Sequence, residues 1–385
     1  KWVKNRTASK AIALAADAHL LPESYLHGMS YVLSGEERPT YVLGKVYPRG
    51  QWFYFPVAFL IKSTLGFLLL LGLAVVVAKP LRRKWSREVL FLIVPAALFF
   101  GVSLTAKINI GLRHILPIYP FLLILAGAAA WVLVERKRTW AWAGGALVVL
   151  HVVSSLRAYP NYLPYSNELW GGPGKTYKVL TDSSVDWGQG LIAVKRYLDD
   201  HHMSDCWLAY FGTVSPHHYD IPCRILPTAF GGVWSSTIDI VPEKIQGTLF
   251  ISASEMSGQF YGPEELNPYG QFLRAKPQTD IAGCILAYKG SFDGRPLAAM
   301  AHVAKAWEFV QGGKLEPALS EAQRALALQP HDPWTYVLLG EIHKQRKQTA
   351  EARQMYQRAI ALARSIAPEH FPYLYEYVQK ELNGL

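Results

Sequence analysis

Three basic side chains lie at the ends of apolar segments, where they could bind a phosphate. Lys62 lies inside an apolar stretch, and the pair Arg113 and His114 directly precedes another. A cation inside a membrane-spanning segment is costly, so it usually marks a functional site or extends to the interface. We therefore expect Lys62, Arg113 and His114 to bind a phosphate group at the outer ends of two spans.

Aromatic side chains and a histidine are expected on the same outer face. Tyr25 and His27 lie in YLHG, and Trp52 and Tyr54 lie in GQWFYFP. Aromatic planes can bind an apolar chain or a sugar ring. The alternative is structural, because belts of Trp and Tyr with flanking cations occur at any bilayer interface.

Four apolar stretches must position these residues. Spans are predicted over about 57–78, 89–106, 115–134 and 140–155, each near the roughly 20 residues that cross a bilayer. Together they predict a helical membrane bundle over residues 53–157. Buried helices of a large soluble protein are the alternative, but four such stretches so close together do not favour it.

The positive charges orient these spans. Most of the basic residues in the loops between the spans lie in two short loops. These residues are Lys79, Arg82, Arg83, Lys84 and Arg87 in the first loop and Arg136, Lys137 and Arg138 in the third. Short loops rich in Lys and Arg stay cytoplasmic. An outward loop over 1–52 and residues 158–385 are then expected outside the inner membrane of a bacterium. Because topology explains much of the net charge of +10, nucleic-acid binding is not required.

Residues 158–290 are predicted to form a small outward α/β domain. Strands are expected at 177–180, 206–211, 248–252 and 284–288, and an amphipathic helix at 190–200. Strands that alternate with helical stretches are typical of α/β folds.

Residues 297–385 have the spacing of tetratricopeptide repeats. The matching positions recur about 34 residues apart. They are Ala306, Phe309, Gly313, Ala318, Ala322, Ala325 and Pro330, then Leu339, Gly340, Ala352, Tyr356 and Ala359. The stretch 371–382 is expected to cap the repeats. A helical hairpin without repeat ancestry is the alternative.

The cysteines and histidines do not indicate a metal site. Cys206, Cys223 and Cys284 are odd in number, so either Cys206 and Cys223 form a disulfide or all three are buried thiols. No Cys-x-x-Cys pair suggests zinc. A divalent metal is not indicated by ligand spacing, and no cofactor is predicted with certainty.

Several motifs occur in one order along the chain. These are YLHG, GQWFYFP followed by Lys62, IGLRHILPIYPFL (110–122), YSNELWGGP and DSSVDWGQG (182–190). Over about residues 15–290 the chain resembles the C-terminal part of bacterial lipid-carrier-dependent glycosyltransferases, the GT-C-type class similar to protein O-mannosyltransferases and aminoarabinose transferases. The resemblance implies an outward-domain motif of Asp182, Asp186, Trp187 and Gln189. The repeat tail looks like an appendage of some members.

The resemblance also implies a mechanism. An acceptor hydroxyl or amine attacks the anomeric carbon of a polyprenyl-phosphate sugar with inversion, assisted by an acidic residue, while cations stabilise the departing phosphate. That acid typically follows the first membrane helix of the family, so we expect it upstream of Lys1. Two departures stand out: Ser63 and Thr64 replace a common Thr-Pro, and Gly190 replaces a common acid.

Two other functions remain open. A transporter would carry polar groups in the middle of several spans, and these spans have few. A non-catalytic envelope scaffold would need only the anchor and the repeats, which would leave Lys62, Arg113 and His114 without a purpose. The expected partners are the lipid-linked sugar donor, membrane lipids and a protein partner or acceptor that binds the repeats.

Overall fold

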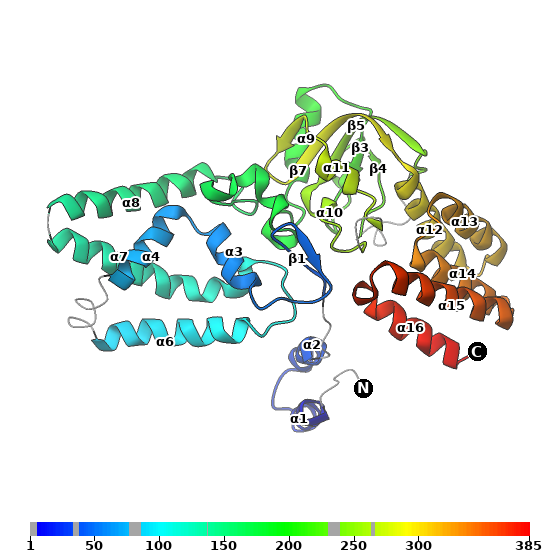
Figure 1. The fold of residues 1–385 in the computed structure, drawn as a ribbon, viewed down its shortest axis with the longest axis horizontal. Helices are drawn as coiled ribbons and strands as arrows, with labels where there is room; N and C mark the ends of the chain where they lie inside the picture. The colour runs from blue at the N-terminus through cyan, green and yellow to red at the C-terminus, as the bar shows by residue number, and fades with distance from the viewer. Residues whose placement is uncertain (1–5, 34–37, 77–85, 137, 230–238, 263–265) are drawn as a thin grey trace.

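The structure is a computed structural model that describes residues 6–33, 38–76, 86–136, 138–229, 239–262 and 266–385 (Figure 1). Long helices lie on one side of a small sheet, and the C-terminal helices lie on the other. The predicted positive loops fall largely outside the described residues, since 79–85 and Lys137 are not among them.

The long helices are α6 (Ser86–Ser103), α7 (Tyr119–Arg136) and α8 (Arg138–Arg157). In the part of the chain that the structure describes, two helices are long and apolar enough to cross a membrane. They are Leu112–Glu135, which joins the 3-10 helix η1 (Leu112–Ile118) to α7, and Arg138–Arg157. Large apolar side chains on their outer faces, such as Trp131 and Trp142, are exposed, as expected for a surface in lipid.

The first predicted span is broken rather than continuous. Helix α3 (Tyr54–Lys62) and helix α4 (Leu65–Val76) meet at a bend of 115°, and together they could form a third, broken span. The chain is extended at Ser63, with φ −87° and ψ 143°. The span predicted over 57–78 therefore corresponds to two helices with a break between them, which the sequence did not predict. The stretches predicted at 89–106, 115–134 and 140–155 overlap α6, α7 and α8, and of these α7 (continuous with η1) and α8 are the candidate membrane spans.

Residues 1–52, predicted as a loop, contain regular elements. Helix α1 (Arg6–Asp17) packs against α2 (Glu23–Leu33). Strands β1 (Thr40–Val42) and β2 (Lys45–Tyr47) form an antiparallel hairpin. Both residues of its turn, Leu43 and Gly44, have positive φ, as a two-residue type I′ turn requires.

A five-stranded mixed sheet has the order β4-β3-β5-β7-β6. The strands are β3 (Trp207–Ala209), β4 (Arg224–Ile225), β5 (Lys244–Ser252), β6 (Thr279–Ile281) and β7 (Ile285–Asp293). Strand β3 runs parallel to β4 and β5, whereas β7 lies between β5 and β6 and runs antiparallel to both. The apolar side of α9 (Leu191–Asp200) packs into one core cluster with these strands.

Most of the predicted elements of this region are confirmed. Strands β3, β5 and β7 overlap the strands predicted at 206–211, 248–252 and 284–288, and α9 overlaps the helix predicted at 190–200. The strand predicted at 177–180 was wrong. There the chain forms the 3-10 helix η3 (Pro173–Lys178), and only Leu180 makes an isolated bridge, with Val42. Tyr177 and Leu180 are three residues apart and both buried, which suits a helical turn.

The C-terminal helices form two consecutive hairpins. Helix α12 (Arg295–Gln311) pairs with α13 (Leu315–Leu328), and α14 (Pro333–Gln345) pairs with α15 (Thr349–Ile366). Helix α16 (Pro372–Asn383), at the helix predicted over 371–382, packs against the second hairpin. Small residues allow the close packing: a Cβ at Gly340 would lie 2.6 Å from the ring of Tyr356.

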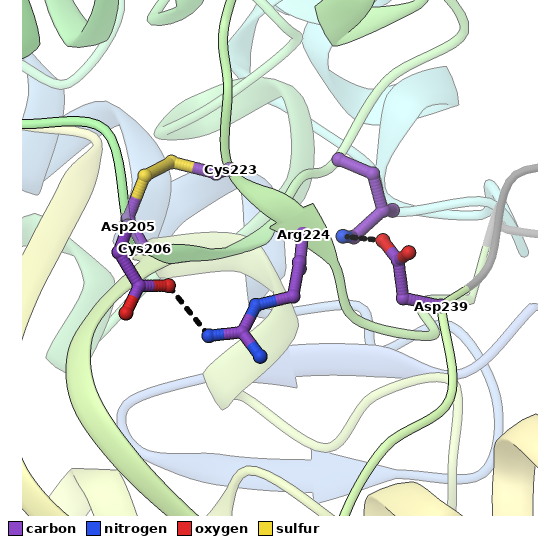
Figure 2. Close-up of a disulfide and its surroundings, with 6 residues drawn as sticks. Asp205, Cys206, Cys223, Arg224 and Asp239 are labelled. Atoms are coloured by element: carbon purple, nitrogen blue, oxygen red, sulfur yellow. Dashed lines mark hydrogen bonds and ion pairs between the residues drawn. A yellow bond between two sulfur atoms is a disulfide. The ribbon is translucent and has the colours of Figure 1, made fainter.

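A disulfide joins Cys206 to Cys223, and Cys284 is a buried free thiol. The bridge links the residues that precede β3 and β4 (Figure 2). Beside it, Arg224 forms an ion pair of 2.6 Å with Asp205 and lies 4.1 Å over the ring of Trp207. These contacts hold the two-residue strand β4 at the edge of the sheet.

Candidate functional site

Motifs that are far apart in the chain meet where the apolar helices join the sheet. The loop of DSSVDWGQG lies against the segment that precedes η1, where the Ser183 hydroxyl donates a hydrogen bond to the carbonyl of Ile110. The motif YSNELWGGP contacts the break between α3 and α4 through Asn167. We call this region the junction site.

Lys62, the last residue of α3, holds two loops of the junction site. Its Nζ donates to the carbonyl of Leu163 at 2.5 Å and to that of Ser184 at 2.7 Å. Two of its three N–H donors are therefore used by main-chain carbonyls. The ammonium points into the protein and ties the motif loops to the broken span.

Asn167 satisfies the carbonyls that the helix break leaves without partners. Its side-chain amide donates to the carbonyls of Leu60 at 2.6 Å and Ser63 at 2.9 Å, and its backbone N–H donates to Ile61 at 2.9 Å. The last carbonyls of a helix have no intrahelical donor and need such partners when buried. Asn167 therefore stabilises the bend and holds YSNELWGGP against it.

Arg113 and Trp187 form the accessible part of the junction site, and the buried carboxyl of Asp182 lies close enough to feel the charge of Arg113. The exposed Arg113 guanidinium lies 4.9 Å from the ring centroid of Trp187, whose side chain is half exposed. Burial raises the pKa of the Asp182 carboxyl to about 6. The hydrogen bond from the Ser183 N–H and the positive charge of Arg113 act in the opposite direction and lower this pKa. The exposed cation and the aromatic plane could together bind an anionic, ring-bearing ligand.

The other residues expected at α3 and η1 are divided between the interior and the surface. Tyr54 is fully buried, and Trp52 is exposed. His114 is half-buried and stacks on Phe55, with ring centroids 6.0 Å apart. Tyr54 and His114 therefore pack within the junction, where His114 neighbours Arg113 in the chain.

Tyr25 and His27 are not brought to the junction site. Both side chains are exposed on α2, and Figure 1 shows α1 and α2 apart from α3. No hydrogen bond or ring contact among the described residues links either side chain to Lys62 or Arg113.

Asp186 and Gln189 shape the loop that presents Trp187. The buried Asp186 carboxylate accepts from the Gly188 N–H at 2.9 Å and from the Ser252 hydroxyl of β5. Gln189 accepts from the Trp187 N–H at 2.7 Å. Burial raises the pKa of Asp186 to about 7, although the hydrogen bonds from Ser252 and Gly188 act to lower it. Both residues hold Trp187 in place below Arg113.

A buried acid that the sequence reasoning missed lies beside the sheet. Glu255 is on α10 (Ala253–Met256), directly after the carboxyl end of β5. Its Oε2 accepts from the Tyr261 hydroxyl, while its Oε1 has no partner. Burial raises the pKa of Glu255 to about 8. The signal in the sequence is an acid three residues after a buried strand, because loops at the carboxyl ends of parallel strands often carry functional groups.

An apolar groove of about 250 Å³ lies beside the junction site. Its lining comes from α3, α6, η1 and α7 and includes Phe59, Ala96, Phe100, Ile118 and Leu122. The short helix η1 connects the two features, since it carries Arg113 near its start and Ile118 at its end. A ligand with an anionic head and an apolar chain could contact both.

In the described ranges, no group of three or more His, Cys, Asp or Glu side chains could hold a metal ion.

Comparison with known proteins gives no relative: no family model matches the chain, and no curated protein or solved structure matches it significantly.

Proposed function

We propose that the chain acts in a membrane glycosyltransferase, which moves a sugar from a polyprenyl-phosphate carrier to an acceptor on the outer face of the membrane. The observation that carries this proposal is the placement of Arg113, Asp182 and Trp187 next to an apolar groove on candidate membrane helices. The groove offers a place for the lipid chain, Arg113 a partner for its phosphate, and Trp187 a surface for the sugar.

The chemistry assigns a limited role to these residues. The bond from the anomeric carbon to an acceptor oxygen or nitrogen forms as the bond to the phosphate oxygen breaks, and the polyprenyl phosphate leaves as an anion. The planar guanidinium of Arg113 stabilises that anion. Asp182 orients Arg113 through its negative charge. The base that takes the acceptor proton is not assigned to any of these residues.

The proposed location is a bacterial inner membrane, crossed by four spans, with residues 158–385 outside. The disulfide between Cys206 and Cys223 supports this side, because disulfides persist in oxidising compartments. The hairpins α12–α13 and α14–α15 are proposed as two tetratricopeptide repeats with α16 as their cap. In support, Ala318, Ala322 and Ala325 are buried, as are the residues 34 positions later, namely Ala352, Tyr356 and Ala359.

Donor binding tests the proposal. A photoreactive polyprenyl phosphate should crosslink to the detergent-solubilised protein. One charge-assisted contact is worth roughly 1.5–3 kcal/mol, so Arg113→Ala should weaken this binding about ten- to a hundredfold. Arg113→Lys should restore part of it, because a point charge lacks the planar fork. The control is Arg157→Ala, which removes an exposed cation from the end of α8.

Equal labelling of the parent and Arg113→Ala would remove Arg113 from the phosphate site. Lys62→Met is expected to act differently, because it removes the side-chain donor from the carbonyls of Leu163 and Ser184. That variant should lower thermal stability as well as binding, and so it is not a clean probe of the phosphate.

A second candidate function is an envelope scaffold that binds a protein through its C-terminal helices. A pocket of about 250 Å³ between the sheet and α12 and α14 favours it, since its lining includes Phe260, Tyr261 and Trp334. If the repeats only recruit a partner, deletion of 297–385 should leave crosslinking to the polyprenyl phosphate largely intact. Lost crosslinking in a folded, membrane-inserted truncation would contradict the separation of the two roles.

A further inference from the structure

The segment that follows α8 turns back along the last turn of that helix. Ser154 lies in this turn, and its hydroxyl donates to the Glu168 carboxylate at 2.8 Å. A second hydrogen bond, of 2.9 Å, joins the Ser154 hydroxyl to the hydroxyl of Tyr165. The 3-10 helix η2 (Glu168–Trp170) therefore lies beside the end of α8 rather than beyond it. Figure 1 shows that this end of α8 is on the side of the sheet.

The main chain of η2 makes its hydrogen bonds within the protein. The Asn167 side chain accepts from the Leu169 N–H at 3.2 Å, while its amide group donates to the carbonyls at the break between α3 and α4. The Trp170 N–H donates to the Asn167 carbonyl at 3.0 Å, and the Gly171 N–H donates to the Glu168 carbonyl at 3.1 Å. Irregular backbone can lie at membrane depth only where protein satisfies its polar groups. The bonds of η2 meet this condition.

Exposed apolar side chains cover the turn between α8 and η2. Leu156 in the last turn of α8 is 66% exposed, and Leu169 of η2 is 78% exposed. Between them along the chain, Tyr159 and Tyr162 are exposed, and their rings meet edge to face with centroids 6.3 Å apart. We call these four residues the outer patch. On α8 the patch continues into exposed valines that share one helical face with Leu156, namely Val149, Val152 and Val153.

The charged groups beside the outer patch suit the headgroup region of a bilayer. Lys175 is exposed and its side chain lies against the end of η2, since a Cβ at Gly171 would come 2.6 Å from Lys175 Cδ. The exposed acid Glu168 is held by the hydroxyl of Ser154. Tyrosines and cations at the end of an apolar helix are typical of a membrane–water interface. Because the patch is continuous with the exposed apolar side of a candidate span, lipid is favoured over a protein partner.

We infer that the outer patch contacts lipid: Leu169 enters the acyl chains of the outer leaflet, and Tyr159 and Tyr162 lie at the level of the headgroups. Lys175 pairs with lipid phosphates at the same level. The inference rests on the proposed membrane location, with α8 as a span, and is independent of sugar transfer. Because Asn167 joins η2 to the break between α3 and α4, the lipid contact fixes the depth of the junction site in the bilayer.

Nitroxide spin labels test this contact in the full chain, reconstituted into vesicles of phosphatidylcholine and phosphatidylglycerol. Cys284→Ala removes the free thiol, and single labels are then attached through Leu169→Cys and Tyr162→Cys. Oxygen is apolar and concentrates among acyl chains, whereas a water-soluble nickel chelate stays outside them. Val149→Cys on α8 provides the lipid reference. Ile192→Cys on α9 provides the water reference, because Ile192 is 52% exposed and Tyr162 is 53% exposed.

The ratio of oxygen to nickel accessibility at Leu169 should exceed that at Ile192 several-fold and approach that at Val149, with Tyr162 between the two. If Leu169→Cys lowers the melting midpoint, Tyr159→Cys replaces it, with the ratio expected for Tyr162. A ratio at the patch equal to that at Ile192, with Val149 in lipid, would overturn the inference and leave the span in place. Low accessibility to both reagents would assign the patch to a protein contact and also overturn it. A low ratio at Val149 would refute the span and the lipid contact together.

Discussion

Glu255→Gln should flatten the pH dependence of the stability of the sheet. Glu255 is fully buried, its Oε2 accepts from Tyr261, and its Oε1 has no partner. Burial raises the pKa of this carboxyl from 4.5 to about 8. In the folded protein it is therefore mostly neutral at pH 7, whereas in the unfolded chain it ionises above about pH 4.5.

The sign and size of the effect follow from this difference. Between pH 4.5 and about 8 the folded state holds the proton and the unfolded state does not, so the free energy of unfolding falls as the pH rises. At 1.36 kcal/mol for each pH unit, the free energy of unfolding falls by up to roughly 5 kcal/mol over the whole interval. Glutamine has nearly the same shape and does not titrate. The variant should therefore lose this part of the decline and exceed the parent in stability above pH 8.

The free thiol of Cys284 provides the assay. It is buried in the sheet, and the other two cysteines of the chain are joined in the disulfide. Its labelling rate in increasing urea, divided by that of a small thiol at the same pH, reports unfolding of the sheet between pH 5 and 9. The matched control is Glu351→Gln, at an exposed position on α15. Parallel pH profiles for the parent and Glu255→Gln would refute the reasoning.

Two further substitutions test the packing. Asn167→Ala removes the side-chain donor from the buried carbonyl of Ser63 and the partly buried carbonyl of Leu60 at the helix break. The free energy of unfolding should therefore fall by roughly 1–3 kcal/mol, seen as a lower thermal midpoint, and an unchanged midpoint would contradict this role of Asn167. Gly340→Ala places a methyl group 2.6 Å from the ring of Tyr356. It should lower the free energy of unfolding of the C-terminal helices by about 1–3 kcal/mol, as measured by thermal melts. Gly313→Ala, where an added Cβ meets nothing within 4 Å but φ is +70°, separates backbone strain from this clash.

The elements that the sequence predicted are those with a strong local pattern. Strands β5 and β7 each contain a run of buried, mostly apolar residues, and α9 presents one apolar side to the core. The hairpin of β1 and β2 has only three residues in each strand, too few to display alternation. The break in the first span depends on Asn167, more than 100 residues away in the chain, and so no local pattern could reveal it.

The candidate site could be predicted as a set of residues but not as a set of contacts. Lys62 was singled out because a cation in an apolar segment is costly. The groups that compensate it are backbone carbonyls, which every residue carries, so the sequence holds no sign of which ones they are. Trp187 was singled out through its motif, but its contact with Arg113 depends on how Asp186 and Gln189 fold the loop.

The junction site divides into residues that hold it together and residues that meet solvent. Lys62, Asn167 and Asp186 direct their polar atoms to main-chain or buried partners, so their loss would unpair buried groups. Arg113 and Trp187 contact each other at the surface, where an exposed cation–π pair contributes only about 0.5–1 kcal/mol to folding. Because these two side chains add little to stability, we propose that their contact at the start of η1, whose other end lines the apolar groove, serves a ligand rather than the fold.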